Sequence, residues 1–118
     1  MPSIILKDEF ADLIREGRKD QLIINDRQSP LVVGDRITLR RSATDKLASG
    51  VVTQARTLRM IKSGNRVRVY IDGELSAGAA VSTVARREGF RGAGEMFARY
   101  VPNSGDDWHG QVIRWKGD

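Results

Sequence analysis

The stretch FADLIREGRKDQLIIN, residues 10–25, predicts a short helix that is followed directly by a strand. Phe10, Leu13 and Ile14 recur at the spacing of one helix face. Asp8 precedes them and can cap the first turn, because a carboxylate there accepts hydrogen bonds from the otherwise unpaired backbone N–H groups. The stretch therefore predicts a helix whose apolar side packs on a core.

Gly17 is suited to end this helix, because glycine readily adopts the left-handed conformation that follows many last turns. Gln21–Ile24 then reads as a strand. Lys19 leaves the turn between the two elements, where it can be partly desolvated and act as a general base or contact a phosphate. The alternative is an exposed cation that interacts with the dipole at the helix end.

The rest of the chain alternates between strand and helix periodicity. Strands are expected at Ser3–Leu6, Gln21–Ile24, Arg36–Arg40, Gly50–Ile61 (with a bend or bulge), Arg66–Ile71 and Gly110–Trp115. After Asp72-Gly73 the period becomes helical, with one helix ending near Gly89 and another over Gly92–Val101. This order predicts an α+β fold, a small mixed β-barrel of about five to six strands flanked by two to three helices.

Length and composition indicate one globular domain over residues 1–118, with 40% hydrophobic and 30% charged residues. The absence of cysteine excludes disulfides, cysteine-based zinc sites and thiol catalysis, and is compatible with a cytoplasmic location. The beginning of the chain does not resemble a signal peptide, and the apolar runs are too short to cross a membrane. His109 is the only histidine, so a histidine-pair metal site or relay is excluded, and we expect no metal and no cofactor.

Positive charge is concentrated in residues 36–68, which hold nine basic residues and one acid and so sum to +8, while the rest of the chain sums to −3. Arginine outnumbers lysine 15 to 5, and guanidinium groups bind phosphates as a planar fork and stack on bases. A polyanion, most commonly nucleic acid, is the partner that this pattern favours. A basic face kept for solubility is the alternative. The candidate nucleic-acid contacts are Arg18, Arg36, Arg40, Arg41, Arg56, Arg59, Arg66 and Arg68.

Three stretches in their order resemble the ASCH domain, a small relative of the PUA RNA-binding barrel. They are residues 10–25, then GDRITLRR at Gly34–Arg41, then Glu88–Trp115, which opens with EGF and closes with HGQVIRW. The resemblance covers nearly the whole chain. It implies a PUA-like barrel that binds RNA, with a cleft to which Lys19 and Glu88 correspond.

Some ASCH members, the acetylcytidine amidohydrolases, use a lysine, a threonine and a glutamate to hydrolyse the acetyl amide of acetylated cytidine. Lys19 and Glu88 match two of these residues and are therefore the candidate catalytic pair. The threonine position holds Leu22, and the arginine that follows in the family strand is Ile24. Leucine has no hydroxyl that a lysine could activate. Glu88 can pair with Lys19 or a neighbouring arginine, contact a base edge, or remain a solvated residue at a helix end.

These observations favour an RNA-binding module over an enzyme. The alternatives are an amidohydrolase acting on acetylated or modified cytidine nucleosides, a ribonuclease of the same family, and a protein-interaction domain with an acidic partner. The expected partner is accordingly RNA, another nucleic acid or a modified nucleoside, with no membrane association. The aromatic residues Phe97, Tyr100, Trp108 and Trp115 are expected in the core or on a surface on which bases stack.

Overall fold

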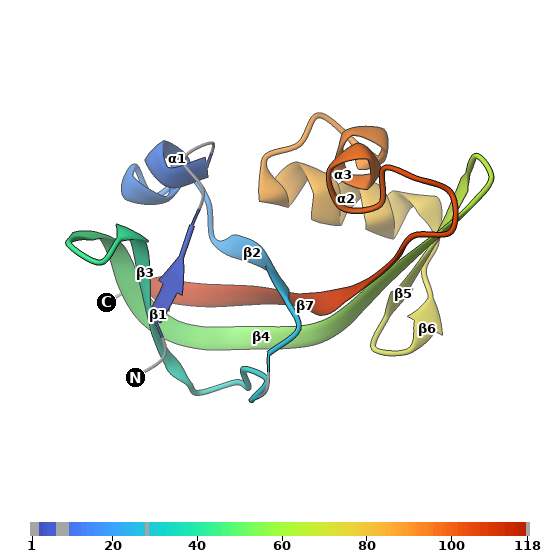
Figure 1. Cartoon of the computed structure of the whole chain (residues 1–118). Helices are drawn as coiled ribbons and strands as arrows, with labels where there is room; N and C mark the ends of the chain where they lie inside the picture. Colours follow the sequence, from blue (N-terminus) through green and yellow to red (C-terminus); the bar gives the residue numbers. More distant parts are fainter. Residues whose placement is uncertain (1–2, 7–9, 28, 118) are drawn as a thin grey trace. The chain divides into compact units, whose positions relative to one another are not determined.

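A computed structural model describes residues 3–6, 10–27 and 29–117 (Figure 1). The described residues form seven strands and three helices, in the order β1 (Ser3–Ile5), α1 (Ala11–Arg15), β2 (Gln21–Asn25), β3 (Arg36–Ser42), β4 (Asp45–Ser63), β5 (Arg66–Ile71), β6 (Glu74–Leu75), α2 (Gly78–Glu88), α3 (Ala93–Tyr100) and β7 (Asp107–Gly117). The predicted α+β class is confirmed. The proposed cap at Asp8 lies outside the described residues. None of the described helices has the length and apolarity needed to cross a bilayer.

The strands form one mixed sheet. Its path runs β1-β3-β4-β5-β6, while β7 pairs with both β2 and β4. The β1–β3 pair is parallel, and the pairs β3–β4, β4–β5 and β5–β6 are antiparallel. Within the described residues β1 and β6 lie at the two ends of the path, so the sheet is not closed, and the predicted barrel is wrong in this respect. Strands of three and two residues offer few ladder hydrogen bonds for closure.

The strands β2, β3, β4 and β7 extend beyond their predicted bounds, and β6 was not predicted. β4 spans 19 residues because its first part continues into a hairpin with β3, where Ser42 pairs with Asp45. Register shifts lie beside Arg40, between Leu39 and Ser42, whereas the β4–β5 ladder from Leu58 to Ser63 is regular. The two residues of β6 are too few to show a periodicity, which explains why the sequence did not reveal this strand.

The chain divides into two compact units. Unit 1 comprises residues 1–22, 31–55 and 113–118, and unit 2 comprises residues 23–30 and 56–112. In unit 1 Ile37 and Leu39, which lie on one face of β3, are fully buried. Thr38, on the opposite face of β3, is buried as well, so both faces of this strand are covered at its centre.

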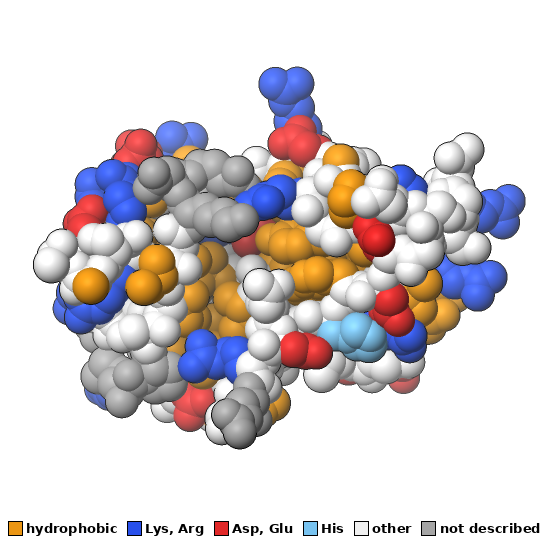
Figure 2. Space-filling view, viewed as in Figure 1, with side chains coloured by type: hydrophobic (Ala, Val, Ile, Leu, Met, Phe, Trp, Pro, Cys, Tyr) orange, Lys and Arg blue, Asp and Glu red, His pale blue; other side chains and the backbone are white. Residues whose placement is uncertain are grey.

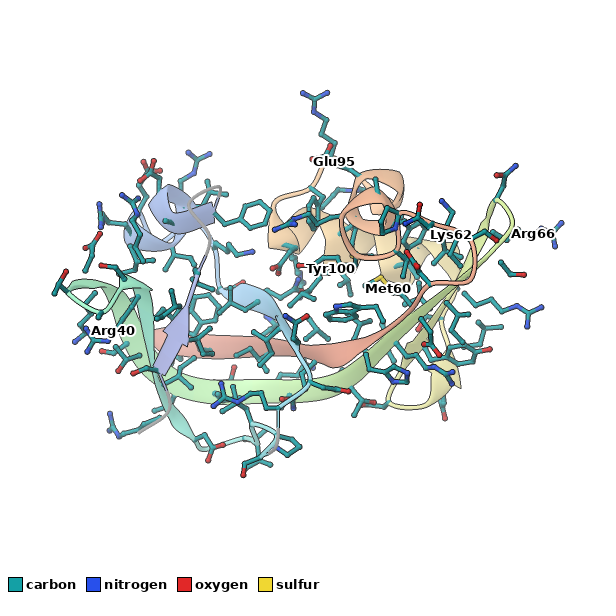
Figure 3. All side chains as sticks on the ribbon, in the orientation of Figure 1. Arg40, Met60, Lys62, Arg66, Glu95 and Tyr100 are labelled. Atoms are coloured by element: carbon teal, nitrogen blue, oxygen red, sulfur yellow. The ribbon has the colours of Figure 1, made fainter. Side chains whose placement is uncertain are left out.

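Unit 2 is built on the β4–β5 hairpin, with α2 and α3 on one side of it (Figure 1). Leu58 and Met60 of β4 and Val69 of β5 are buried. Lys62 alternates with Met60 and so shares its face, and its Nζ donates to the carbonyl oxygen of Pro102 at 3.0 Å, directly after α3. This face therefore lies beneath α3, as the labelled Met60 and Lys62 show in Figure 3. Burying each such apolar side chain contributes about 1.5–3 kcal/mol to folding.

Candidate functional site

Lys19 is positioned by the end of α1. Gly17 adopts φ 72°, and its N–H donates to the carbonyl oxygen of Ile14 at 3.0 Å. The N–H of Arg18 donates to the carbonyl oxygen of Leu13 at 2.8 Å. These two bonds form a Schellman motif, which ends the helix and directs the chain into β2. The predicted role of Gly17 as the residue that ends the helix is confirmed.

The Lys19 side chain is buried in unit 1. The residue is only 4% exposed, and its Nζ lies 4.3 Å from the centroid of the Phe10 ring. An ammonium over an aromatic face is attracted by the negative charge of the π-system, most strongly where water is excluded. The interpretation of Lys19 as an exposed cation is therefore wrong. The desolvation expected of a lysine base is present.

Glu88 is the last residue of α2 and lies in unit 2. Gly89 follows at φ 117°, and the bonds from Gly89 N–H to Arg86 O (3.1 Å) and from Phe90 N–H to Ala85 O (3.0 Å) form a second Schellman motif. Glu88 is only 2% exposed, so the interpretation as a solvated helix-end residue is wrong. Its Oε2 accepts the N–H of Ile23 at 3.0 Å, which fixes the carboxyl group beside β2.

An aromatic cluster begins two residues after Glu88. The ring centroids of Phe90 and Tyr100 lie 6.2 Å apart in an edge-to-face arrangement, and those of Tyr100 and Trp108 lie 4.8 Å apart. Trp108 Nε1 donates to Asn25 Oδ1 at 2.9 Å, which fixes the indole. Tyr100 and Trp108 are half-buried, whereas Trp115 belongs to the buried core of unit 1.

Lys19 and Glu88 belong to different units, so their predicted meeting in one cleft stays a prediction. The burial of the residues in β2, the strand that follows Lys19 in the sequence, is directly defined. Leu22 is 2% exposed and Ile24 is also buried, so the residues that the resemblance to ASCH domains aligns with threonine and arginine are packed as core. Neither residue presents a polar group to a ligand.

The candidate arginines of unit 1 differ in their surroundings. Arg18 is exposed and lies 3.4 Å from Glu16, and Arg36 is exposed at the start of β3. Arg41 is half-buried and bonds to Asp12 at 3.2 Å, with Asp45 at 3.9 Å. Arg40 is half-buried and makes no ion pair within the described residues. The charge of Arg41 is thus already offset by carboxylates.

Among the candidate arginines of unit 2, two lie beside carboxylates and two are exposed without a carboxylate partner within the described residues. Arg56 lies 3.9 Å from Asp72. Arg59 donates two hydrogen bonds to the Asp107 carboxylate, one from Nε at 3.0 Å and one from a terminal nitrogen at 2.8 Å. This bond lowers the pKa of the Asp107 carboxyl and raises the pKa of Arg59. Arg66 and Arg68 are exposed, and no carboxylate of the described residues pairs with them.

The register of the hairpin places three arginines on one surface. Arg66, Arg68 and Tyr70 alternate along β5, and Arg59 is the partner of Tyr70 across the β4–β5 ladder. Paired residues of adjacent strands project to the same face, opposite to that of Met60 and Lys62. We call Arg59, Arg66, Arg68 and Tyr70 the arginine face. It points away from α3, and Arg66 extends outward near the hairpin tip (Figure 3).

A pocket of about 420 Å³ opens beside Tyr70 in unit 2. Its polar and aromatic lining comes from four segments of unit 2, namely Asp26, Thr57, Arg59, Tyr70 and His109. His109 Nε2 lies 3.1 Å from Asp107 Oδ1, so one carboxylate holds both the imidazole and Arg59. Figure 2 shows this histidine at the surface in pale blue, with acidic and basic side chains around it.

Gly110 brings two of these segments together. A Cβ at Gly110 would overlap the carbonyl oxygen of Ile24 and the ring of Trp108, so β2 and β7 can approach this closely only at a glycine. The N–H of Asp26 donates to the carbonyl oxygen of His109 at 3.3 Å, which places the Asp26 segment beside His109 at the pocket.

Sequence reasoning missed the pocket although it identified part of its wall. The predicted strand Arg66–Ile71 contains Tyr70, and His109 directly precedes the predicted strand Gly110–Trp115. Asp26 and Thr57 gave no signal, because only the pairing of β7 with both β2 and β4 brings their segments together.

In the part of the chain that the structure describes, no three histidine, cysteine, aspartate or glutamate side chains are grouped to hold a metal ion. No family model, curated protein or solved structure matches this chain.

Proposed function

We propose that this protein binds nucleic acid, RNA in preference, through the arginine face of unit 2. The observation that carries the proposal is the row of Arg66, Arg68 and Tyr70 along one face of β5, with no carboxylate of the described residues paired with either arginine. Among the other candidate arginines, Arg41, Arg56 and Arg59, itself part of the arginine face, already lie beside carboxylates. The positive potential of the hairpin is therefore concentrated on the two arginines next to Tyr70.

The spacing of this row suits an extended single strand. Alternate residues of a β-strand lie about 6.6 Å apart, a distance comparable with that between successive phosphates of an unstacked strand. Arg66 and Arg68 can each present a guanidinium fork to one phosphate. Each neutralised phosphate releases condensed counterions, which makes binding favourable at low salt and weaker as salt rises.

Tyr70 adds a contact that a simple counterion surface lacks. Aromatic side chains beside a basic groove stack on bases, and such stacking contributes about 1–3 kcal/mol per base in single-strand binders. Bases are available for stacking in unpaired RNA. The likeness of the chain to the ASCH and PUA group is the further support for RNA over DNA.

The test is a pair of double variants with equal loss of charge. Arg66→Ala/Arg68→Ala removes the free arginines of the face, and Arg86→Ala/Arg87→Ala removes two exposed arginines from the last turn of α2 in the same unit. Binding of a fluorescent single-stranded RNA is measured by anisotropy over a series of salt concentrations. We expect the first variant to weaken binding and to reduce the slope of log affinity against log salt by about 1.4, or about 0.7 per lost phosphate contact.

The control variant should keep a slope close to that of the wild type. Equal effects of the two variants would reduce the arginine face to general surface charge and would contradict the proposal.

A second candidate is hydrolysis of acetylated or modified cytidine, or of RNA itself. The observation that favours it is the burial of both Lys19 and Glu88, because desolvated ionisable groups are common in active sites. Chromatography of the RNA and of added acetylcytidine after incubation with the protein separates the two candidates. It detects turnover, which a binding module does not produce.

A further inference from the structure

We infer that the pocket beside Tyr70 binds a guanine base of the nucleic acid that lies along the arginine face. This inference rests on the proposed function and specifies its ligand. The pocket volume of about 420 Å³ lies near the lower end of the range, about 300–1,000 Å³, that is typical of small-molecule sites. It is lined by two rings, a carboxylate and a guanidinium, the groups with which proteins hold bases.

The position of the pocket follows from the strand register. Tyr70 lines the pocket and is two residues from Arg68 on the same face of β5, about 6.6 Å along the strand. A nucleotide whose phosphate contacts Arg68 can therefore place its base against Tyr70. Tyr70 is half-buried and lines the pocket, so part of its side chain is accessible to a base that enters.

Two charged groups in the lining favour guanine over the other bases. Asp26 supplies the carboxylate among the described residues that line the pocket, and an ionised carboxylate only accepts hydrogen bonds. Guanine offers two adjacent donors, the N1–H and the exocyclic amine, that suit both carboxylate oxygens. Adenine, cytosine and uracil each place an acceptor next to their donor on this edge.

Arg59 supplies the complementary contact. Its bonds to Asp107 use Nε and one terminal nitrogen, so the other terminal nitrogen remains to donate toward the pocket. Guanine presents O6 and N7 as acceptors, the usual partners of arginine, whereas adenine has an amino group where guanine has O6. Asp107 thus acts as a positioning residue that fixes the guanidinium before the base arrives.

The experiment compares octa-uridine RNA carrying one central guanosine with the same RNA carrying one adenosine. Wild-type protein should bind the guanosine oligomer about 5- to 150-fold more tightly, the range expected of one well-formed two-point base contact. Asp26→Asn should abolish this preference, because an amide replaces one acceptor by a donor. Tyr70→Ala should lower affinity for the guanosine oligomer more than for octa-uridine.

Glu74→Gln is the matched control, since it removes one exposed carboxylate of the same unit outside the pocket lining and should leave the preference intact. Circular dichroism checks that every variant is folded. Equal affinity of wild-type protein for the two oligomers, with Arg66→Ala/Arg68→Ala still weakening both, would overturn the guanine inference and leave the proposed function standing.

A titration with guanosine monophosphate alone tests whether the pocket binds guanine when RNA does not bind. If no RNA binds but the mononucleotide shifts the NMR signals of Tyr70 and His109 in wild type and not in Asp26→Asn, the proposed function fails and the inference is overturned for nucleic acid, while the pocket is shown to bind a guanine mononucleotide. If neither RNA nor the mononucleotide binds, both are overturned.

Discussion

Leu22 occupies the position at which the ASCH likeness places a threonine, and its side chain is packed in the core of unit 1. The sequence alone shows that position 22 has no hydroxyl nucleophile, because this depends only on which residue is present. Its burial could not be predicted from the sequence, because a strand residue can face a ligand or a core equally well. The same holds for Lys19 and Glu88, whose positions followed from the sequence but whose burial depends on tertiary packing.

Replacing Leu22 with threonine should destabilise the protein by about 2–4 kcal/mol without creating an enzyme. The substitution removes buried methyl groups and inserts a hydroxyl among apolar neighbours. Urea unfolding measures the first effect, and liberation of acetate from acetylated cytidine by wild type and variant measures the second. Efficient turnover by the wild type, or turnover that appears on Leu22→Thr, would favour the hydrolase over the binding module.

Asp107 makes a pH-dependent contribution to stability. Arg59 lowers the pKa of its carboxyl, so the folded state favours the ionised form. This contribution is present above the unfolded pKa of about 3.9 and is lost as the pH falls through the lower folded value. We expect Asp107→Asn to be less stable than wild type at pH 7 and pH 5, with the difference becoming smaller as the pH falls from 5 to 3.

Urea midpoints of both proteins at the three pH values test this expectation. Glu74→Gln, which removes an exposed carboxylate that makes no ion pair within the described residues, is the reference for general charge effects. A gap between Asp107→Asn and wild type that widens toward pH 3 would contradict the sign of the shift.

At the scale of elements, the two Schellman motifs fix where α1 and α2 end, and so fix the backbone beside Lys19 and Glu88. The glycines that end these helices were recognisable in the sequence, because few other residues tolerate the left-handed conformation. The strand Arg66–Ile71 was likewise predicted with the bounds that β5 has. The extension of β4 back to Asp45 was not predictable, since it depends on pairing with β3 rather than on local pattern.

Two alanine substitutions at glycines should act in opposite directions. Gly89→Ala places a Cβ at φ 117° and should destabilise by about 1–2 kcal/mol. Gly94→Ala, inside α3 with no atom within 4 Å of the added Cβ, should stabilise by about 0.5–1 kcal/mol. Thermal unfolding of the two variants beside wild type measures both effects, and a stabilising Gly89→Ala would show that the turn before Phe90 relaxes.

At the scale of the whole molecule, the charge that the sequence places in one segment is divided between the two units. Residues 36–55 hold four basic residues and one acid and so carry +3, and residues 56–68 hold five basic residues and carry +5. Composition revealed the sum but not the division, because the boundary falls inside one continuous strand, β4.

Single and double variants test whether both units contact the same nucleic acid. Arg40 of unit 1 and Arg68 of unit 2 make no ion pair within the described residues, so each is available for a phosphate. If one RNA strand contacts both, Arg40→Ala and Arg68→Ala should each reduce the salt slope by about 0.7, and the double variant by about 1.4, because the contributions of independent phosphate contacts add. Lys116→Ala and Arg87→Ala serve as controls, one exposed cation from each unit. A double variant that matches Arg68→Ala alone would confine the interface to unit 2, and one that matches Arg40→Ala alone would remove the arginine face from it.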